Sequence, residues 1–380
     1  MLGLRPTSGG PTAPVDDPLA ITDVVRATDL VLEHVLDTAL VRAHGVDPVF
    51  ARDVAARVSA FVRRGGKRLR TAFVWCGWRA SGGTGDATAA LNIGAALELL
   101  QACALIHDDV MDGSVQRRGA PAVHVDFARG HWAAGMNGSA ESFGTSAAVL
   151  AGDLALAWAD DLLTETALDS PHGMRLYREW QAMRGEMVAG QYRDLYAQAN
   201  GSSGADEALT IATLKSALYT VERPLALGAS LAGADEGTLA ALRAAGRCAG
   251  LAFQLRDDLL GAFGDPALTG KPAGDDLRSR KLTYLLAIAL QLADDADDSM
   301  ATAVLAPGPS TRTERTVERM RSALASTGAQ AMVEAKIMEL AAASLRHFEA
   351  TGAGPVVRRQ FAALVTQASG VEVPTDGSLS

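Results

Sequence analysis

Three carboxylates stand within five residues in the stretch LIHDDVMD at 105–112. The stretch follows an apolar run, so on a helix Asp108 and Asp112 lie one turn apart on one face, with Asp109 on the flank. Like charges at this spacing repel each other and need a compensating cation. Oxygen ligands on a rigid helix suit Mg²⁺, which keeps several waters and is completed by substrate phosphates. A solvated acidic helix end is the alternative for this stretch alone.

A second apolar helix, expected at 240–260, carries another acidic pair, Asp257 and Asp258, about 150 residues after the first. Basic residues of the kind that hold phosphate are distributed between and around the two acidic stretches. They are Lys67, Arg70, Arg117, Arg118, Lys215, Lys271 and Lys281. Arginine suits a bidentate grip on phosphate. The two acidic stretches therefore point to a diphosphate bridged by metal ions between them.

The segment RRGGKRLR at 63–70 places a glycine pair before an apolar helix. Such an entry exposes backbone N–H groups where the helix dipole favours an anion. Lys67 and Arg70, three residues apart, would share one helical face. A surface charge cluster is the alternative for this segment.

The chemistry that these residues indicate is ionisation. A diphosphate held by Mg²⁺, lysine and arginine becomes a good leaving group, because its developing charge is stabilised where it forms. No Ser-His-Asp or Cys-His arrangement and no phosphate-binding glycine motif of the nucleotide-binding kind is present. We interpret His107 as a packed residue rather than a base, and we expect the apolar helices to hold a hydrocarbon chain.

The elements that must position these residues are helices. Hydrophobic residues make up 48% of the 380 residues and aromatic residues only 5%, and β-branched clusters are scarce, which favours an all-α fold. We expect a long loop at 129–145, of the kind that often forms a lid, and a buried Asp153. Apolar periodicity predicts helices at 21–43, 49–62, 71–78, 88–112, 147–163, 177–197, 210–231, 240–260, 282–293, 313–325, 329–350 and 355–368.

Composition limits the other possibilities. We expect a disordered arm at 1–18, one domain at 19–368 and a tail at 369–380. The net charge of −9 argues against a general nucleic-acid surface. The three cysteines, Cys76, Cys103 and Cys248, are far apart in apolar surroundings, which is typical of core residues in a reducing compartment. With no signal core and no long uncharged apolar run, we predict a cytoplasmic protein without a membrane span.

The motifs as a set resemble those of the trans-isoprenyl diphosphate synthases (polyprenyl synthetases), and their sequences are similar to those of the bacterial geranylgeranyl diphosphate synthases. The similarity covers about residues 20–368. The motifs are GGKRLR at 65–70, IHDDVMD at 106–112, RRG at 117–119, GQ at 190–191, KSALYT at 215–220, FQLRDD at 253–258 and GDPALTGKPAGDD at 264–276. The resemblance implies a single-domain all-α bundle of the isoprenoid synthase type, with a central apolar cavity, that forms a homodimer.

The resemblance also implies roles for individual residues. The implied substrates are isopentenyl diphosphate and an allylic diphosphate (dimethylallyl, geranyl or farnesyl), and the implied cofactor is Mg²⁺, three ions with diphosphate bound. The metal ligands are Asp108, Asp109, Asp112, Asp257 and Asp258. Isopentenyl diphosphate is bound by Gly66, Lys67, Arg70, Gln101 and Arg118. The allylic diphosphate is bound by Arg117, Lys215, Lys271 and Lys281. Thr220 and Gln254 lie near the developing carbocation and complete the catalytic set with the aspartates and Lys215.

The sequence departs from this pattern in three places: at Thr71, which replaces a frequent proline, at Ser279, Arg280 and Leu282 around Lys281, and at one position of the second acidic motif. Gly261 stands where the second motif often has a third aspartate. With Asp257 and Asp258 intact, we expect weaker or differently balanced Mg²⁺ binding rather than loss of activity.

Product length depends, by the same resemblance, on Cys103 and Ala104, which precede Asp108. Ala104 is four residues before Asp108 and therefore lies beneath it on the same face. Bulky aromatic residues at these positions stop growth at fifteen carbons in the family. Both are small here, so we expect geranylgeranyl diphosphate, with twenty carbons. The alternatives are a synthase of farnesyl or of longer diphosphates and, with less support, a class I terpene cyclase or a non-catalytic synthase subunit.

Overall fold

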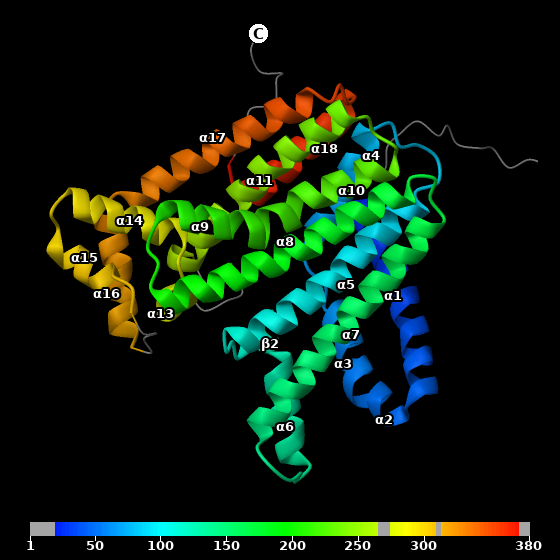
Figure 1. Ribbon diagram of the computed structural model, residues 1–380, viewed down its shortest axis with the longest axis horizontal. Helices are drawn as coiled ribbons and strands as arrows, with labels where there is room; N and C mark the ends of the chain where they lie inside the picture. The colour runs from blue at the N-terminus through cyan, green and yellow to red at the C-terminus, as the bar shows by residue number, and fades with distance from the viewer. Residues whose placement is uncertain (1–19, 265–273, 309–312, 372–380) are drawn as a thin grey trace, which may run out of the picture.

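A computed structural model describes residues 20–264, 274–308 and 313–371 (Figure 1). Within these residues the protein is helical apart from one short antiparallel pair, β1 (Gln116–Arg117) and β2 (Ala120–Pro121), so the all-α prediction is confirmed. The helices of the first half are α1 (Ile21–Val46), α2 (Pro48–Phe50), η1 (Ala51–Ala55), α3 (Ala56–Arg63), α4 (Leu69–Ala80), α5 (Thr88–Met111), α6 (Val123–Ala133), α7 (Ala140–Leu168) and α8 (Gly173–Asn200). Those of the second half are α9 (Ala205–Ala212), η2 (Thr213–Glu222), α10 (Arg223–Leu231), α11 (Glu236–Phe263), α13 (Asp275–Ser279), α14 (Tyr284–Asp295), α15 (Ser299–Leu305), α16 (Glu314–Ser326), α17 (Ala329–Glu349) and α18 (Pro355–Ser369).

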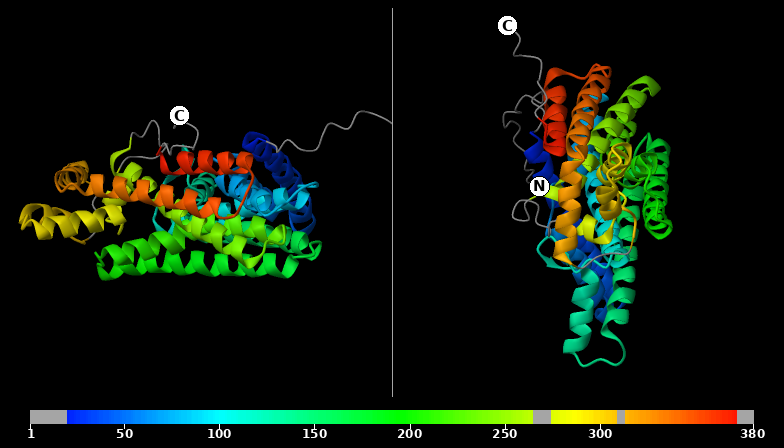
Figure 2. Two further views of the ribbon diagram at one scale, coloured as in Figure 1. Left: turned by 90° about the horizontal axis from the view of Figure 1, so that it is seen from above. Right: turned by 90° about the vertical axis from the view of Figure 1, so that its left-hand side faces the viewer.

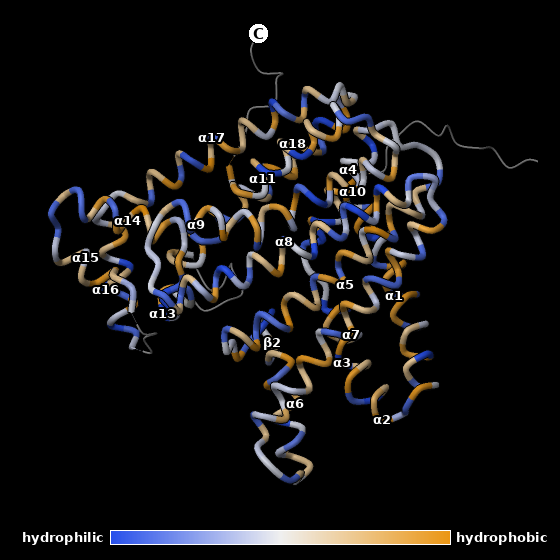
Figure 3. Tube along the Cα trace, in the orientation of Figure 1, coloured by the Kyte–Doolittle hydropathy of each residue, from blue (hydrophilic) through white to orange (hydrophobic). Residues whose placement is uncertain are grey.

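Helix α5 lies in the middle of the bundle and packs against α1, α4, α7 and α10 (Figure 1). Its long apolar run is buried, with Leu97, Leu99 and Leu100 fully enclosed. Outer helices such as α8 and α17 alternate between polar and apolar residues along the chain (Figure 3), as expected for helices that bury one face. The acidic stretch thus ends a helix that the core holds rigidly.

Two helices are long and apolar enough to cross a membrane, judged by length and composition alone. They are α5 and α7, and 67% and 39% of the relevant stretches are buried in the fold. A mostly buried core helix commonly meets the same criterion, and residues of α5 lie in the core. The absence of a membrane span and a cytoplasmic location stay predictions.

The segment 129–145, which we expected to be a loop, is largely helical, so this prediction was wrong. Helix α6 extends to Ala133, and α7 begins at Ala140 after the N-cap Ser139, whose side chain accepts a hydrogen bond from the Ser142 N–H group. The small residues serve close helix packing instead, because a Cβ on Gly144 would lie 2.3 Å from the carbonyl oxygen of His124 on α6.

Other predictions differ from the structure in detail. Asp153, expected to be buried, is exposed on α7. The expected helix at 210–231 is three consecutive segments, α9, η2 and α10, and Pro224 stands in the first turn of α10, where its missing N–H is tolerated. The short helix α15 was not predicted.

Candidate active site

The first acidic cluster lies at the end of α5, where three cations surround it. Asp108 accepts hydrogen bonds from the Lys215 Nζ (3.2 Å) and from the Arg117 Nη2 (3.3 Å). Burial alone would raise the pKa of Asp108, but the charges of Lys215, Lys281 and Arg117 outweigh it and hold the pKa below its ordinary value. Asp108 is therefore a carboxylate at neutral pH.

Asp109 has a different environment, although it is the neighbour of Asp108 in sequence. Its side chain is fully buried and accepts a hydrogen bond from the Arg117 Nε (2.9 Å). Burial raises the pKa of Asp109 despite that contact. Its Oδ2 atom is buried, with no hydrogen-bond partner in the described part of the chain. In this arrangement Asp109 holds Arg117 in place beside Asp108.

Asp194 on α8 is a site residue that we did not predict. Its side chain is 1% exposed, and its Oδ2 contacts the Nζ atoms of Lys215 (2.7 Å) and Lys281 (3.3 Å). Burial would raise the pKa of Asp194, but the two lysines hold it below its ordinary value. One buried carboxylate thus fixes two of the cations that surround the acidic cluster.

The position of Asp194 follows from the GQ motif. A Cβ on Gly190 would lie 2.3 Å from the backbone nitrogen of Lys215, so only glycine lets α8 approach η2 this closely. Asp194 is one turn after Gly190 and therefore on the same face of α8. The motif was visible in the sequence, and a carboxylate four residues after its glycine was the signal that could have identified Asp194.

The segment η2, which carries Lys215 and Thr220, is a π-helix, a form that is often found at functional sites. It is pressed against α11 as closely as against α8. A Cβ on Gly250 would lie 2.4 Å from the carbonyl oxygen of Ala217, and one on Gly246 would lie 2.5 Å from the Cα of Glu222. The two glycines of α11 therefore fix the relation between η2 and the second acidic cluster.

The second acidic cluster lies on α11 and combines an exposed and a buried carboxyl group. Asp257 is exposed, whereas Asp258 is 7% exposed and accepts a hydrogen bond from the Gln254 Nε2 (2.7 Å). Burial, together with the negative charges of Asp276 and Asp257, raises the pKa of Asp258 to about 8. A cation would reverse this and favour the carboxylate.

Lys281 connects the two clusters. Its Nζ lies 3.1 Å from the Asp112 Oδ2, and its charge also interacts with Asp276 and Asp108. Burial would lower the pKa of Lys281, but the charge of Asp194 and these interactions raise it well above its ordinary value. Residues from distant parts of the chain therefore share one electrostatic site. Lys271 lies outside the described residues.

A second polar network joins α4, α5 and η2. The Arg70 guanidinium lies 4.1 Å from the centre of the Tyr219 ring and donates from Nη2 to the Thr220 hydroxyl (3.0 Å). The Tyr219 hydroxyl in turn donates to the Gln101 Oε1 (2.6 Å). Tyr219 was not among the predicted residues, and it is the group that connects two of them, Arg70 and Gln101.

Lys67 and Arg70 do not share a helical face, so this prediction was wrong. Helix α4 begins at Leu69, and Lys67 is an exposed residue of the preceding connection. Arg68 adopts a left-handed conformation (φ 49°) and pairs with the buried Glu98 (2.7 Å). That ion pair anchors the connection to α5 and leaves Lys67 facing solvent.

Arg118 lies beside the same connection. A Cβ on Gly66 would be 3.0 Å from the Arg118 Nη2, so the guanidinium covers the Gly66 backbone. Arg118 also lies over the Phe61 ring, 5.7 Å from its centre. The structure therefore places Gly66, Lys67 and Arg118 together, with Arg70 at the start of α4.

The two residues predicted to limit product length differ in exposure. Cys103 is 3% exposed, and its Sγ lies 3.7 Å from the Nδ1 of His107. Ala104 is half-buried. His107 places its Nε2 3.1 Å from the carbonyl oxygen of Val149 on α7, which is the position of a packed residue.

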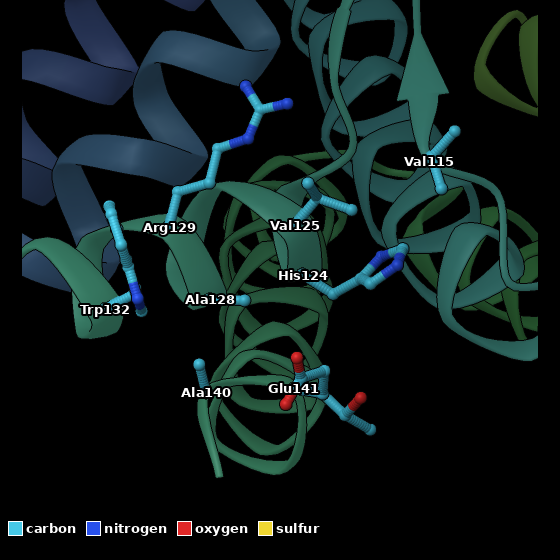
Figure 4. A pocket seen from close by; sticks show the side chains of 9 residues that line it. Val115, His124, Val125, Ala128, Arg129, Trp132, Ala140 and Glu141 are labelled. Carbon is cyan, nitrogen blue, oxygen red and sulfur yellow. The ribbon is translucent and has the colours of Figure 1, made fainter. Parts of the chain in front are cut away.

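The structure also contains a pocket of about 500 Å³ near the free end of α6 and α7 (Figure 4). His124, Arg129, Trp132 and Glu141 are among the residues that line it. None of the predicted site residues lines this pocket. It is therefore not the central cavity that we expected, and that cavity stays a prediction.

The donor chemistry of the two clusters fits Mg²⁺, because every candidate ligand atom is a carboxylate oxygen. Among the described residues, however, no three histidine, cysteine, aspartate or glutamate side chains converge as a ready metal cage. Lysine and arginine neutralise the carboxylates of the first cluster instead. This is the arrangement expected of a site in which substrate phosphates complete the coordination.

Known proteins resemble this chain over most of its length. Residues 52–324 match the model of the polyprenyl synthetase family. The geranylgeranyl diphosphate synthase of Mycobacterium tuberculosis is 38% identical over 255 residues, which are 67% of this chain and 66% of that protein. The (2E,6E)-farnesyl diphosphate synthase of the same organism is 38% identical over 218 residues, 57% of this chain and 55% of that protein. The alignments thus span less than two thirds of the length of these two relatives.

Among solved structures, the geranylgeranyl pyrophosphate synthase of Corynebacterium glutamicum, complexed with isoprenyl diphosphate and magnesium, superimposes with a TM-score of 0.87. It is 38% identical, and the match covers 92% of this chain and 99% of that one. The likeness therefore extends over nearly the whole fold.

Proposed function

Because the chain belongs to the polyprenyl synthetase family, we propose that it is a Mg²⁺-dependent trans-prenyltransferase. It condenses isopentenyl diphosphate head to tail with an allylic diphosphate by ionisation, condensation and elimination. The observation that carries the proposal is the cation set Arg117, Lys215 and Lys281, which is held against the aspartates of α5. The charge of Lys281 also acts on Asp258 of α11. These side chains suit an allylic diphosphate between the two clusters.

Bound Mg²⁺, which we propose as three ions together with the diphosphate, would neutralise the charge that develops on the leaving group. Asp108, Asp112 and Asp257 offer carboxylate oxygens to it, and Asp258 does so once a cation favours its ionised form. Lys215 and Lys281 can turn from the carboxylates to the phosphate oxygens without leaving the site, because Asp194 holds both. Asp109 fits a supporting role through Arg117 better than direct coordination, since its side chain is fully buried.

Isopentenyl diphosphate binds at the other phosphate-binding group, which is formed by Gly66, Lys67, Arg70 and Arg118. Arg70 reaches Thr220 and the Tyr219 ring, and Tyr219 reaches Gln101. This network connects the second substrate with η2, which also carries Lys215. Binding of one substrate can thereby orient groups that face the other.

The product that we propose is geranylgeranyl diphosphate. The small side chains of Cys103 and Ala104, which precede Asp108 on α5, are expected to leave space for a hydrocarbon that grows along this helix. The M. tuberculosis relatives named above include both a geranylgeranyl and a farnesyl diphosphate synthase at equal identity. Product length therefore depends on residues of this chain rather than on its overall likeness.

We also propose a homodimer that forms through α8. Val188, Tyr192 and Tyr196 recur every four residues and are 65%, 66% and 55% exposed, which makes a continuous apolar stripe on one face. Helix α8 lies at an outer edge of the molecule in both views of Figure 2. Light scattering should give twice the mass of the chain, and Val188→Glu with Tyr192→Glu should give the monomer. The matched change Val41→Glu on α1, at a site 74% exposed, should leave the mass unchanged.

Release of diphosphate by the purified protein tests the activity. Release should require both isopentenyl diphosphate and an allylic diphosphate, stop on chelation of Mg²⁺ and resume when Mg²⁺ is restored. Asp108→Asn should abolish it, because the carboxylate that faces three cations is lost. Release from the allylic substrate alone at the same rate would indicate a cyclase or a phosphatase instead.

A further inference from the structure

The second acidic cluster lacks a carboxylate at the position one turn after Asp257. That position is Gly261, four residues later and therefore on the same face of α11. With glycine there, the helix offers only Asp257 and Asp258 from its own sequence. The space that a longer side chain would take must be filled by another group.

Asp276 fills that space. A Cβ on Gly261 would lie 2.7 Å from the Oδ2 and 3.7 Å from the Cγ of Asp276. Real Cβ atoms essentially never approach another atom as closely as the first of these distances, so no side chain can stand at position 261 while Asp276 keeps its place. The carboxylate of Asp276 thus lies directly over the gap in the α11 motif.

Backbone contacts hold Asp276 in this position. The Gly274 N–H donates to the Gly261 carbonyl oxygen (2.8 Å), and the Lys281 N–H donates to the Asp276 carbonyl oxygen (2.9 Å). Gly274 has a positive φ of 85°, which favours glycine. The short helix α13 is therefore fastened to α11 at the residue that lacks a side chain.

The charge of Asp276 acts within the cluster. It raises the pKa of Asp258, as the charge of Asp257 also does. It also attracts Lys281, which contacts Asp112 of the first cluster. Asp276 thus faces the same space as the acidic residues of both helices.

We propose that, once a cation draws the three side chains together, Asp276 supplies the third carboxylate of the second metal site in place of a residue at position 261. This inference rests on the proposed function. It makes α13 a part of the site rather than a connection between α11 and α14. It also implies that the glycine and the distant aspartate form one unit, which can be exchanged for an aspartate on α11 itself.

Four proteins test the exchange: wild type, Asp276→Asn, Gly261→Asp, and the double variant Gly261→Asp with Asp276→Ala. The measurement is the Mg²⁺ concentration that half-saturates the binding of inorganic pyrophosphate, followed by calorimetry. This reads the metal site without turnover. Asp295→Asn, at an exposed position at the end of α14, is the matched control, because it removes the same charge away from the clusters.

We expect Asp276→Asn to raise the half-saturating Mg²⁺ concentration about tenfold, since a charged contact is replaced by a neutral one. Gly261→Asp alone should also weaken binding, because it displaces Asp276. The double variant should return to within about threefold of wild type, and Asp295→Asn should match wild type. Thermal unfolding without Mg²⁺ shows that each variant is folded before it is compared.

Two results would overturn the proposal. One is an Asp276→Asn protein that binds Mg²⁺ and pyrophosphate as wild type does. The other is a folded double variant that stays as weak as the Asp276 variant, which would mean that Asp276 only packs against Gly261. Turnover of wild type with isopentenyl diphosphate tests the proposed function separately, so the two failures can be told apart.

Discussion

Removal of the Asp194 charge should disturb both stability and substrate binding. Asp194→Asn keeps the shape of a side chain that is 1% exposed, but it takes the negative charge from contacts with Lys215 at 2.7 Å and Lys281 at 3.3 Å. Loss of one member of a buried ion pair costs about 3–5 kcal/mol. Each lysine retains a second carboxylate, Asp108 or Asp112. We therefore expect the free energy of unfolding to fall by about 2–3 kcal/mol.

The pH dependence has a definite sign. The pKa of Asp194 is below its ordinary value in the folded protein, so its contribution to stability is present above the pKa of an unfolded aspartate and is lost as the pH falls through the lowered value. The difference between wild type and Asp194→Asn should therefore be largest at neutral pH and should shrink in acid. Urea denaturation of the metal-free proteins at several pH values measures it.

Kinetics separate a role at the site from a purely structural one. Without Asp194 the two lysines should return to the carboxylates of the first cluster, and the KM for the allylic diphosphate should rise about tenfold or more. Glu222→Gln is the control, because Glu222 is also 1% exposed and accepts from Arg247 at 2.8 and 3.2 Å. It should lose stability without a change in KM. An Asp194→Asn protein with unchanged stability and unchanged KM would refute this account of the lysines.

Three further predictions concern the other groups of the site. Burial and neighbouring charge raise the pKa of Asp258 to about 8, so the metal-free protein should lose stability as the pH rises from about 4 to about 8, by about 1 kcal/mol per pH unit. Urea denaturation of Asp258→Asn should show a flatter dependence on pH. An unchanged dependence would contradict the assignment. Lys67→Ala and Arg70→Ala should each raise the KM for isopentenyl diphosphate about tenfold and spare that of the allylic substrate, whereas equal effects on both would show that the two sites are misassigned. Ala104→Phe should shorten the product to fifteen carbons with little loss of rate, and an unchanged product would place the hydrocarbon along another face.

The fold could be predicted from the sequence wherever apolar periodicity was strong. The long helices α5, α11 and α17 are close to the predicted ranges, because each buries a continuous face. The segment 129–145 could not be predicted, since the same glycine and small residues that mark loops also let α7 pack closely against α6. The start of α4 was misjudged because the Arg68–Glu98 ion pair, which fixes the preceding connection, joins residues 30 apart.

The candidate site shows the same division. The aspartates and basic residues could be named from their motifs, but their partners could not. Asp194 belongs to the site because it pairs with Lys215 and Lys281, which lie 21 and 87 residues further along the chain. Asp276 belongs to the site because α13 places its carboxylate against Gly261 of α11. Such roles depend on tertiary packing, which a single sequence reveals only where a glycine marks the close approach.

The measurement that tests the central claim most directly is mass spectrometry of the products formed from isopentenyl diphosphate and each allylic primer in turn. We predict one dominant product, the linear twenty-carbon diphosphate, from dimethylallyl, geranyl and farnesyl primers alike, and none without Mg²⁺. Cyclic hydrocarbons, or no product from any primer with folded protein, would contradict the proposed prenyltransferase. A fifteen-carbon end point would leave the reaction in place and refute the argument from Cys103 and Ala104.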